Sequence, residues 1–368
     1  MLPLILFDLV YMGAIAKLYL ASVGLVSPIG MNLEMTWSSF RAGISRQALS
    51  NYRSKSFHPI RVASAPDMQE ELHSAIKLPE GGELRYTKML LLAQQAISQN
   101  MADLDGQVDK PLPMFVSVPE SLPQATDNFC ENFISDLAVQ AELDEFIDVA
   151  LSRKIASGRS GVLEALDMAY RYHESTKAPY SCIGGIDSFD ETLLEFLDAD
   201  DRLNHEAALQ GFIPGEGAAF LVVTPFKHLA RSFGEFHIII GPPSTGYEPG
   251  HLYSEEPYLG EGLAESFAGV FKNVRQTADT LFTSLNGEQY WSKELGVATI
   301  RHQKFLHDPY NVEHPADCYG DLGAGCGGAL LALSAQHLAE KNSQCLNLVY
   351  CSSDAGNRCT VLMGRESI

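Results

Sequence analysis

Apolar runs of strand length alternate with segments of helical periodicity along most of this chain. The strand-like runs lie at 18–26, 114–120, 180–188, 211–225, 236–241, 278–287, 346–353 and 359–364. The helical patterns lie at 87–99, after Ser160, at 260–275 and after Gly323. This alternation predicts an α/β fold.

The order of elements in the first half recurs in the second. No linker rich in Pro or Ser separates the halves, so the chain is interpreted as one pseudo-duplicated body with halves at 17–225 and 226–368. Segments rich in Gly, Pro or charge predict surface loops at 78–84, 241–258 and 307–318.

Residues 1–16 are apolar but do not have the pattern of a signal peptide. The segment lacks a basic start and carries Asp8 within the apolar run. It is also too short and too interrupted to span a bilayer. We interpret it as a leader or an upstream start, because Met12 offers an alternative start.

Composition narrows the classes of partner. A formal net charge of −20 opposes sequence-independent binding to nucleic acid and to an acidic membrane surface. The seven cysteines form no CxxC pair and no Cys/His ligand spacing, which predicts buried, reduced thiols in a cytoplasmic protein with no metal. No cofactor is expected.

Four segments carry a resemblance to a known family. They are the strand, Ser-Pro-Ile-Gly turn and helix of 20–45, GGIDSF at 184–189, GFIPGEGAAFLVV at 211–223 and GDLGAGCGGALLAL at 320–333. In this order they resemble the β-ketoacyl synthases. The resemblance implies the five-layered αβαβα thiolase fold, commonly as a homodimer.

Active members of that family use a cysteine thiolate at a helix N-terminus, assisted by two histidines. The resemblance places Gly158 at the nucleophile, with Ser157 or Arg159 as the alternatives if the register shifts by one residue. It places Asn286 and Asp321 where the histidines belong. Glycine offers no nucleophile, asparagine does not exchange a proton near neutral pH, and a carboxylate opposes developing negative charge.

These departures imply a catalytically degenerate ketosynthase-like protein without condensing activity. It would be a binding or adaptor module, either a homodimer or the heterodimer partner of a related chain. Similar proteins in bacteria, encoded near toxin-delivery genes, also suggest a secreted effector or a carrier protein as partner. The alternative is an acyltransferase or thioesterase of altered mechanism, with Ser157, Asn286 and Asp321 acting on acyl-CoA or acyl-carrier-protein thioesters.

Other motifs have structural interpretations. GAGCGG at 323–328 fits G-x-G-x-x-G, but no strand pattern precedes it, so small-residue helix packing is favoured over dinucleotide binding. Glu216 is expected to be a buried carboxylate that holds a turn. The acidic run at 198–201 is interpreted as solvated charge. His205, His228 and His237 lie outside the aligned site segments and are expected to be surface or core histidines. His314 lies closer, seven residues before Asp321, and would approach the site if its loop folded inward.

Overall fold

The computed structural model describes residues 15–66, 84–121, 130–140, 143–272, 274–341 and 343–368. The interpretation of 1–16 as a leader therefore falls almost wholly outside the described residues, as does most of the loop expected at 78–84. In the described ranges, none of the helices combines the length and the apolar character needed to cross a membrane.

Helices and strands alternate as the hydrophobic pattern predicts. The helices are α1 (Leu33–Arg41), α3 (Leu84–Asp103), α4 (Phe133–Gln140), α5 (Gly161–Thr176), α6 (Glu191–Ala199), α7 (Glu261–Phe271), α8 (Gln289–Arg301), α9 (Ala316–Tyr319) and α10 (Cys326–Glu340). The strands of the first half are β1 (Leu18–Val26), β2 (Ala48–Arg53), β3 (Pro59–Val62), β4 (Met114–Ser117), β5 (Arg153–Ile155), β6 (Ser181–Asp187) and β7 (Gly217–Thr224). Those of the second half are β8 (Ser232–Phe233), β9 (Phe236–Ile240), β10 (Ser244–Tyr247), β11 (Ala278–Thr283), β12 (Leu306–Glu313), β13 (Asn347–Ser352) and β14 (Asn357–Ser367).

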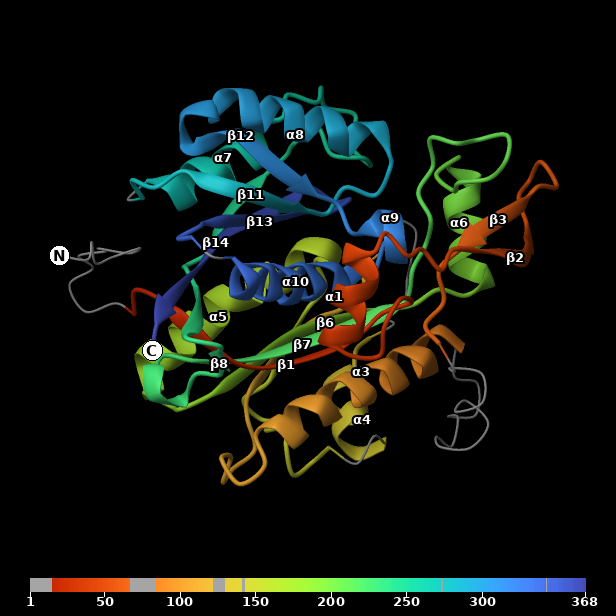
Figure 1. Cartoon of the computed structure of the whole chain (residues 1–368). Coiled ribbons are helices and arrows are strands. Elements are labelled where there is room, and N and C mark those ends of the chain that lie inside the picture. The colour runs from red at the N-terminus through yellow and green to blue at the C-terminus, as the bar shows by residue number, and fades with distance from the viewer. Residues whose placement is uncertain (1–14, 67–83, 122–129, 141–142, 273, 342) are drawn as a thin grey trace.

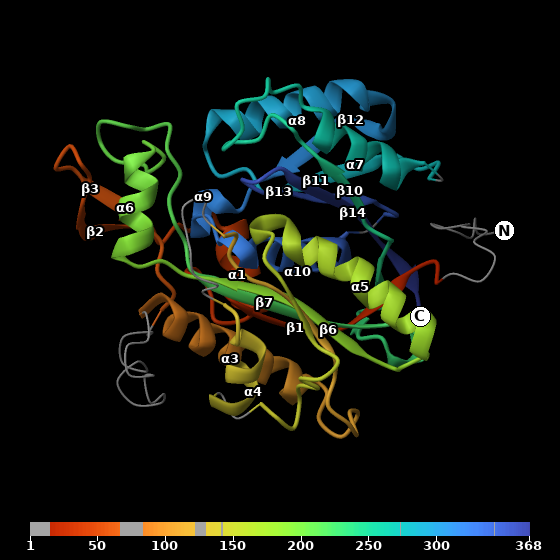
Figure 2. The same ribbon diagram turned by 180° about the vertical axis from the view of Figure 1, so that it is seen from behind.

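The elements stack in five layers, αβαβα, as the resemblance implied. Figure 1 shows α7 and α8 on one outer face and α3 with α4 on the other, with α5 and α10 between two layers of strands. Each helical layer covers the apolar face of a layer of strands. The view from behind shows α5 and α10 side by side in this central layer (Figure 2).

Strand pairing repeats between the two halves. The order β1-β7-β6-β4-β5 in the first half matches β9-β14-β13-β11-β12 in the second. In both series the first two pairings are antiparallel and the last two are parallel. The halves join where Leu18 and Tyr19 of β1 pair with Ile240 and Ile239 of β9. The duplication inferred from element order is therefore visible in the topology, and position 225/226 lies between β7 and β9.

The central helices need small residues because strands pack closely on them. A Cβ added at Gly328 of α10 would lie 2.8 Å from the Cβ of Ala219 on β7. One at Gly325 would lie 2.9 Å from the carbonyl oxygen of Gly217. GAGCGG is therefore a packing motif, as predicted.

Glu216 is a buried carboxylate, as predicted. It accepts from Lys88 Nζ at 2.9 Å and from the Ser188 hydroxyl at 2.8 Å.

All seven cysteines are free thiols and buried, in agreement with the prediction from their spacing. Two other predictions are wrong. The loop expected at 307–318 contains β12, an edge strand in which Leu306 alone is buried, so it lacks an apolar pattern and tolerates Pro309. The loop expected at 241–258 contains β10, which pairs with β14.

A small lobe stands away from the layered body. It consists of the β2–β3 hairpin and α6, which Figure 1 shows side by side at one edge of the molecule. Ile60, Val62, Leu194 and Leu197 belong to the apolar core of this lobe. Asp198, expected to be solvated, is buried there and accepts the backbone N–H of Lys55. The interpretation of 198–201 as solvated charge is therefore wrong for Asp198.

Candidate functional site

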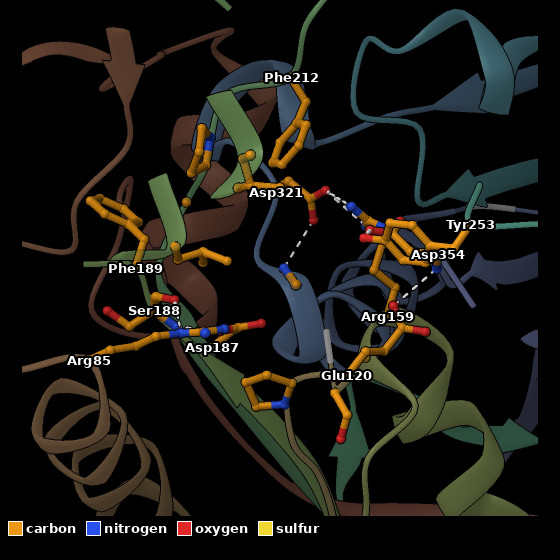
Figure 3. A pocket seen from close by; sticks show the side chains of 18 residues that line it. Arg85, Glu120, Arg159, Asp187, Ser188, Phe189, Phe212, Tyr253, Asp321 and Asp354 are labelled. Atoms are coloured by element: carbon orange, nitrogen blue, oxygen red, sulfur yellow. Dashed lines mark hydrogen bonds and ion pairs between the residues drawn. The ribbon is translucent and has the colours of Figure 1, made fainter. Parts of the chain in front are cut away.

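A pocket open to solvent lies where both halves contribute loops. Its empty volume is about 690 Å³. Its walls come from the end of β4, the start of α5, the end of β6, the loop before β7 and the loops preceding α10 and β14. Figure 3 shows the side chains that line it. They are Arg85, Pro119, Glu120, Ser121, Gly158, Arg159, Asp187, Ser188, Phe189, Leu193, Leu197, Phe212, Pro214, Gly215, Tyr253, Asp321, Gly323 and Asp354.

Gly158 is buried on the pocket wall, in the short turn η1 (Gly158–Ser160) that leads into α5. Its φ of +57° is in the left-handed region, which favours glycine. A Cβ added there would lie 2.7 Å from Cγ of Glu120. The position that the resemblance assigns to the nucleophile therefore has neither a side chain nor room for one while Glu120 keeps its place.

Glu120 follows strand β4 and reaches the loop between β13 and β14. Its carboxylate accepts the backbone N–H groups of Asp354 at 3.0 Å and Ala355 at 3.2 Å. Burial and the neighbouring Asp354 carboxylate raise the pKa of Glu120 to about 7, although Arg159 and the two N–H donors act in the opposite direction. The backbone donors of this loop thus already hold a carboxylate of the chain itself.

Arg159 connects the remaining predicted positions. Its Nε donates to Asp321 Oδ2 at 2.8 Å, and its Nη1 donates to Asp354 at 2.6 Å. Asn286 Nδ2 donates to the same oxygen of Asp321 at 2.8 Å. The structure therefore brings Asn286 and Asp321 together as the resemblance implied, and Arg159 bridges Asp321 to Asp354.

A second arginine extends this network. Arg202 binds Glu288 at 2.9 Å and Asp354 at 2.7 Å. Burial alone would raise the pKa of Asp354, but Arg159 and Arg202 together hold that pKa well below its ordinary value. Burial alone would lower the pKa of Arg159, but Asp321 and Asp354 together raise that pKa well above its ordinary value. Asp354, Arg159 and Arg202 therefore remain ionised near neutral pH.

The opposite wall has its own ion pair. Arg85 donates to Asp187 at 2.7 Å and to the carbonyl oxygen of Ser188 at 2.7 Å. Asp187 also accepts the backbone N–H of Ala324 at 3.2 Å. Figure 3 shows this pair facing the Arg159 network across the pocket.

Ser157, the possible substitute nucleophile, is not among the residues that line the pocket. Its hydroxyl donates to Glu164 at 3.0 Å and accepts from Asn357 at 3.1 Å. None of its hydrogen bonds is to Asn286 or Asp321. The structure therefore does not bring together the three residues of the altered-mechanism alternative.

Among the residues that the structure describes, no histidine lines the pocket. His205 stacks on His58 with ring centroids 5.4 Å apart, and His237 Nδ1 lies 3.0 Å from the carbonyl oxygen of Arg231. His314 pairs with Asp317 at 2.9 Å, and His228 is exposed on the surface. Within the described ranges, no group of three or more His, Cys, Asp and Glu side chains is arranged to hold a metal ion.

Sequence reasoning missed Glu120, Arg202 and Asp354 as members of the site. A signal for Glu120 was present, because a polar residue directly after a buried parallel strand often reaches a site at the strand's carboxyl end. Arg202 lies in a loop far along the chain from its partners, so no spacing could have indicated it. The assembled site offers charge pairs and backbone donors, but no side-chain nucleophile at Gly158.

Comparisons with known proteins support the fold. No family model and no curated protein matches this chain. Among solved structures, the ishigamide ketosynthase/chain length factor matches with a TM-score of 0.74 at 14% identity, over 95% of this chain and 99% of that chain. A type II polyketide synthase acyl-carrier protein in complex with its ketosynthase bound to the hexaketide matches with a TM-score of 0.75 at 12% identity, over 95% and 99% of the two chains.

A third match comes from a larger chain. It is the ketosynthase from module 6 of the bacillaene synthase of Bacillus subtilis 168, with a TM-score of 0.73 at 10% identity, over 96% of this chain and 72% of that chain. At these identities the likeness concerns the fold. Together with the five layers and the repeated strand order, it shows that this chain has the thiolase fold in the form found in ketosynthases.

Proposed function

We propose that this protein is a catalytically silent ketosynthase-like subunit that acts by binding, paired with a related chain of the same fold. The observation that carries the proposal is the contact between Gly158 and Glu120. The position of the nucleophile has no side chain, and the side chain of Glu120 occupies the adjoining space. Covalent capture of an acyl group at this position has no acceptor atom.

The loop donors give further support. In an acyl-transfer site, backbone N–H groups stabilise the oxyanion of the tetrahedral intermediate. Here the N–H groups of Asp354 and Ala355 are bonded to Glu120. A substrate carbonyl would have to displace an internal carboxylate before using them.

The network around Arg159 has the properties of a fixed structural element. Asp321 accepts from Arg159, from Asn286 and from the backbone N–H of Gly323 at 2.9 Å. Both oxygens of this carboxylate are therefore already bonded to groups of the chain itself. The pairing partner is inferred from the matched proteins, one of which is described as a ketosynthase/chain length factor.

The altered-mechanism alternative has one supporting contact, the hydrogen bond from Ser157 to Glu164. A serine hydroxyl bonded to a carboxylate can be activated as a nucleophile. Its hydroxyl, however, is bonded to groups outside the pocket. The residues that would assist it are bonded elsewhere, since Asp321 accepts from Arg159 and Asn286 donates to Asp321.

The test is intact-mass spectrometry of the pure protein after incubation with acyl-CoA and acyl-carrier-protein thioesters, with thiol release measured in parallel. An active ketosynthase serves as the positive control, and Ser157→Ala is the matched variant. We expect neither an adduct nor thiol release above background. An adduct on Ser157, or turnover lost in Ser157→Ala, would refute the proposal and favour the alternative.

Partner binding is tested separately by native mass spectrometry after co-expression with related ketosynthase chains from the same genome. A defined heterodimer supports the proposed pairing. A chain that remains a homodimer or monomer with every candidate contradicts the pairing. The absence of catalysis is tested by the adduct experiment and does not depend on this result.

A further inference from the structure

The β2–β3 hairpin differs in charge from the rest of the molecule. Residues 35–66 contain no Asp or Glu and five Lys or Arg, in a chain whose formal net charge is −20. Arg53 and Arg61 lie on the hairpin itself, and Lys55 lies in its turn. The hairpin is therefore a basic segment on an acidic protein.

Strand register separates the two faces of the hairpin. Leu49 pairs with Arg61, and Arg53 pairs with Pro59. Because side chains alternate along a strand, Ile60 and Val62 point to the face opposite Arg61, and both are buried against the α6 side of the lobe. The outer face carries Leu49, which is 61% exposed, together with Arg53 and Arg61, which are also exposed.

Charge pairing follows the same division. The carboxylates near the hairpin belong to the α6 side, where Asp201 pairs with Lys55 at 2.8 Å. Burial first, and then Asp198, Glu195 and Glu191, raise the pKa of Tyr52 on that side. Among the described residues, neither Arg53 nor Arg61 has an ion-pair partner. In these parts of the chain, the positive charge of the outer face is thus left without a carboxylate partner.

The tip of the hairpin carries an aromatic side chain in a costly conformation. Phe57 is 85% exposed and has a φ of +62°. A bulky residue in the left-handed region is strained, and here neither burial nor packing compensates the strain. Exposed aromatic residues next to arginines are typical of the residues that dominate binding energy at protein interfaces.

We infer that the outer face of the β2–β3 hairpin, formed by Leu49, Arg53, Phe57 and Arg61, is a docking surface for an acidic protein segment with an apolar anchor. The two arginines pair with its carboxylates, and Phe57 and Leu49 contact its apolar side chains. The inference rests on the hairpin alone and does not depend on whether the pocket is catalytic.

The test is fluorescence anisotropy with the full chain and a labelled helical peptide that carries Leu on one face and Glu on the other. A peptide with Lys in place of Glu is the control for charge. The key variant is Arg53→Glu with Arg61→Glu. Its matched control is Arg171→Glu with Lys304→Glu, which alters the net charge equally at exposed positions on other elements.

We expect the hairpin variant to lose affinity for the acidic peptide by at least about tenfold, the matched control to lose much less, and salt to weaken binding. Phe57→Gly is a second variant, because glycine relieves the strained backbone. It should keep or raise the melting temperature while weakening peptide binding, which separates a binding role from a structural one.

Equal affinity of the wild type and both double variants would overturn the inference. So would tighter binding to phosphatidylglycerol vesicles or to a DNA duplex than to the acidic peptide, since either would assign the surface to another class of partner. Self-association abolished by the hairpin variant, measured by sedimentation, would also overturn it by assigning the surface to a second copy of this chain.

Discussion

The side chain of Glu120 packs against Gly158, where a Cβ would lie 2.7 Å from Cγ of Glu120. The two residues come from neighbouring strand ends of the first half, and the loop preceding β14 in the second half holds the Glu120 carboxylate. One contact therefore joins Gly158, the occupied backbone donors and the junction between the halves. Three predictions concern this contact and the buried charges around it, and a fourth concerns the buried His173.

Adding a side chain at position 158 should be more costly than adding one at an unobstructed glycine. Gly43 has a similar φ of +66°, but no atom lies within 4 Å of an added Cβ. Gly43→Ala should therefore cost about 1–2 kcal/mol of unfolding free energy from backbone strain alone. Gly158→Ala should cost more in urea denaturation, and Glu120→Ala should remove the excess. Equal costs for the two glycines would contradict the proposed contact.

The stability of the folded chain should fall as pH rises through neutrality because of Glu120. Its pKa is raised from 4.5 to about 7, so its contribution is fully present below about 4.5 and is lost as pH rises through about 7. Glu120→Gln cannot ionise and should lose less stability between pH 5 and 8. The difference should be on the order of 1–3 kcal/mol, measured by urea denaturation across that range. Parallel pH profiles would refute the assignment.

Removing Arg159 should be strongly destabilising because it would leave buried carboxylates without their partner. Arg159→Leu should cost about 3–5 kcal/mol of unfolding free energy. The matched control is Arg171→Ala, since Arg171 forms an exposed pair with Asp167 at 2.7 Å. That change should cost less than about 1 kcal/mol. Similar costs for the two variants would mean that the Arg159 network is solvated.

Acid should destabilise the fold through His173. Burial lowers the pKa of His173 to about 4, and its Nε2 lies 2.9 Å from the Ser181 hydroxyl. Because the unfolded side chain takes up a proton near 6.5, stability should fall as pH drops from about 6.5 to about 4. His173→Gln should reduce this loss in thermal melts at several pH values. His314→Gln, at a half-exposed surface pair, is the control and should retain it.

Much of the fold could be predicted from the sequence, because buried strands and helices impose periodic apolar patterns on the chain. The apolar run at 18–26 became β1 (Leu18–Val26), and the small residues after Gly323 became the start of α10. Segments at the surface were predicted poorly. Strand β12 was missed because its edge position leaves only Leu306 buried, and without buried positions the strand has no apolar pattern.

The sequence by itself determined the element order, the duplication and the glycine at position 158, where the resemblance places the nucleophile, since these depend on local pattern and residue type. Only the tertiary structure decided what fills the site. Glu120 and Gly158 are 38 positions apart in sequence numbering, and Arg159 meets Asp321 and Asp354 across still longer separations. Which buried charges become partners depends on how the two halves pack, because pairing is set by distance in space and by shared burial.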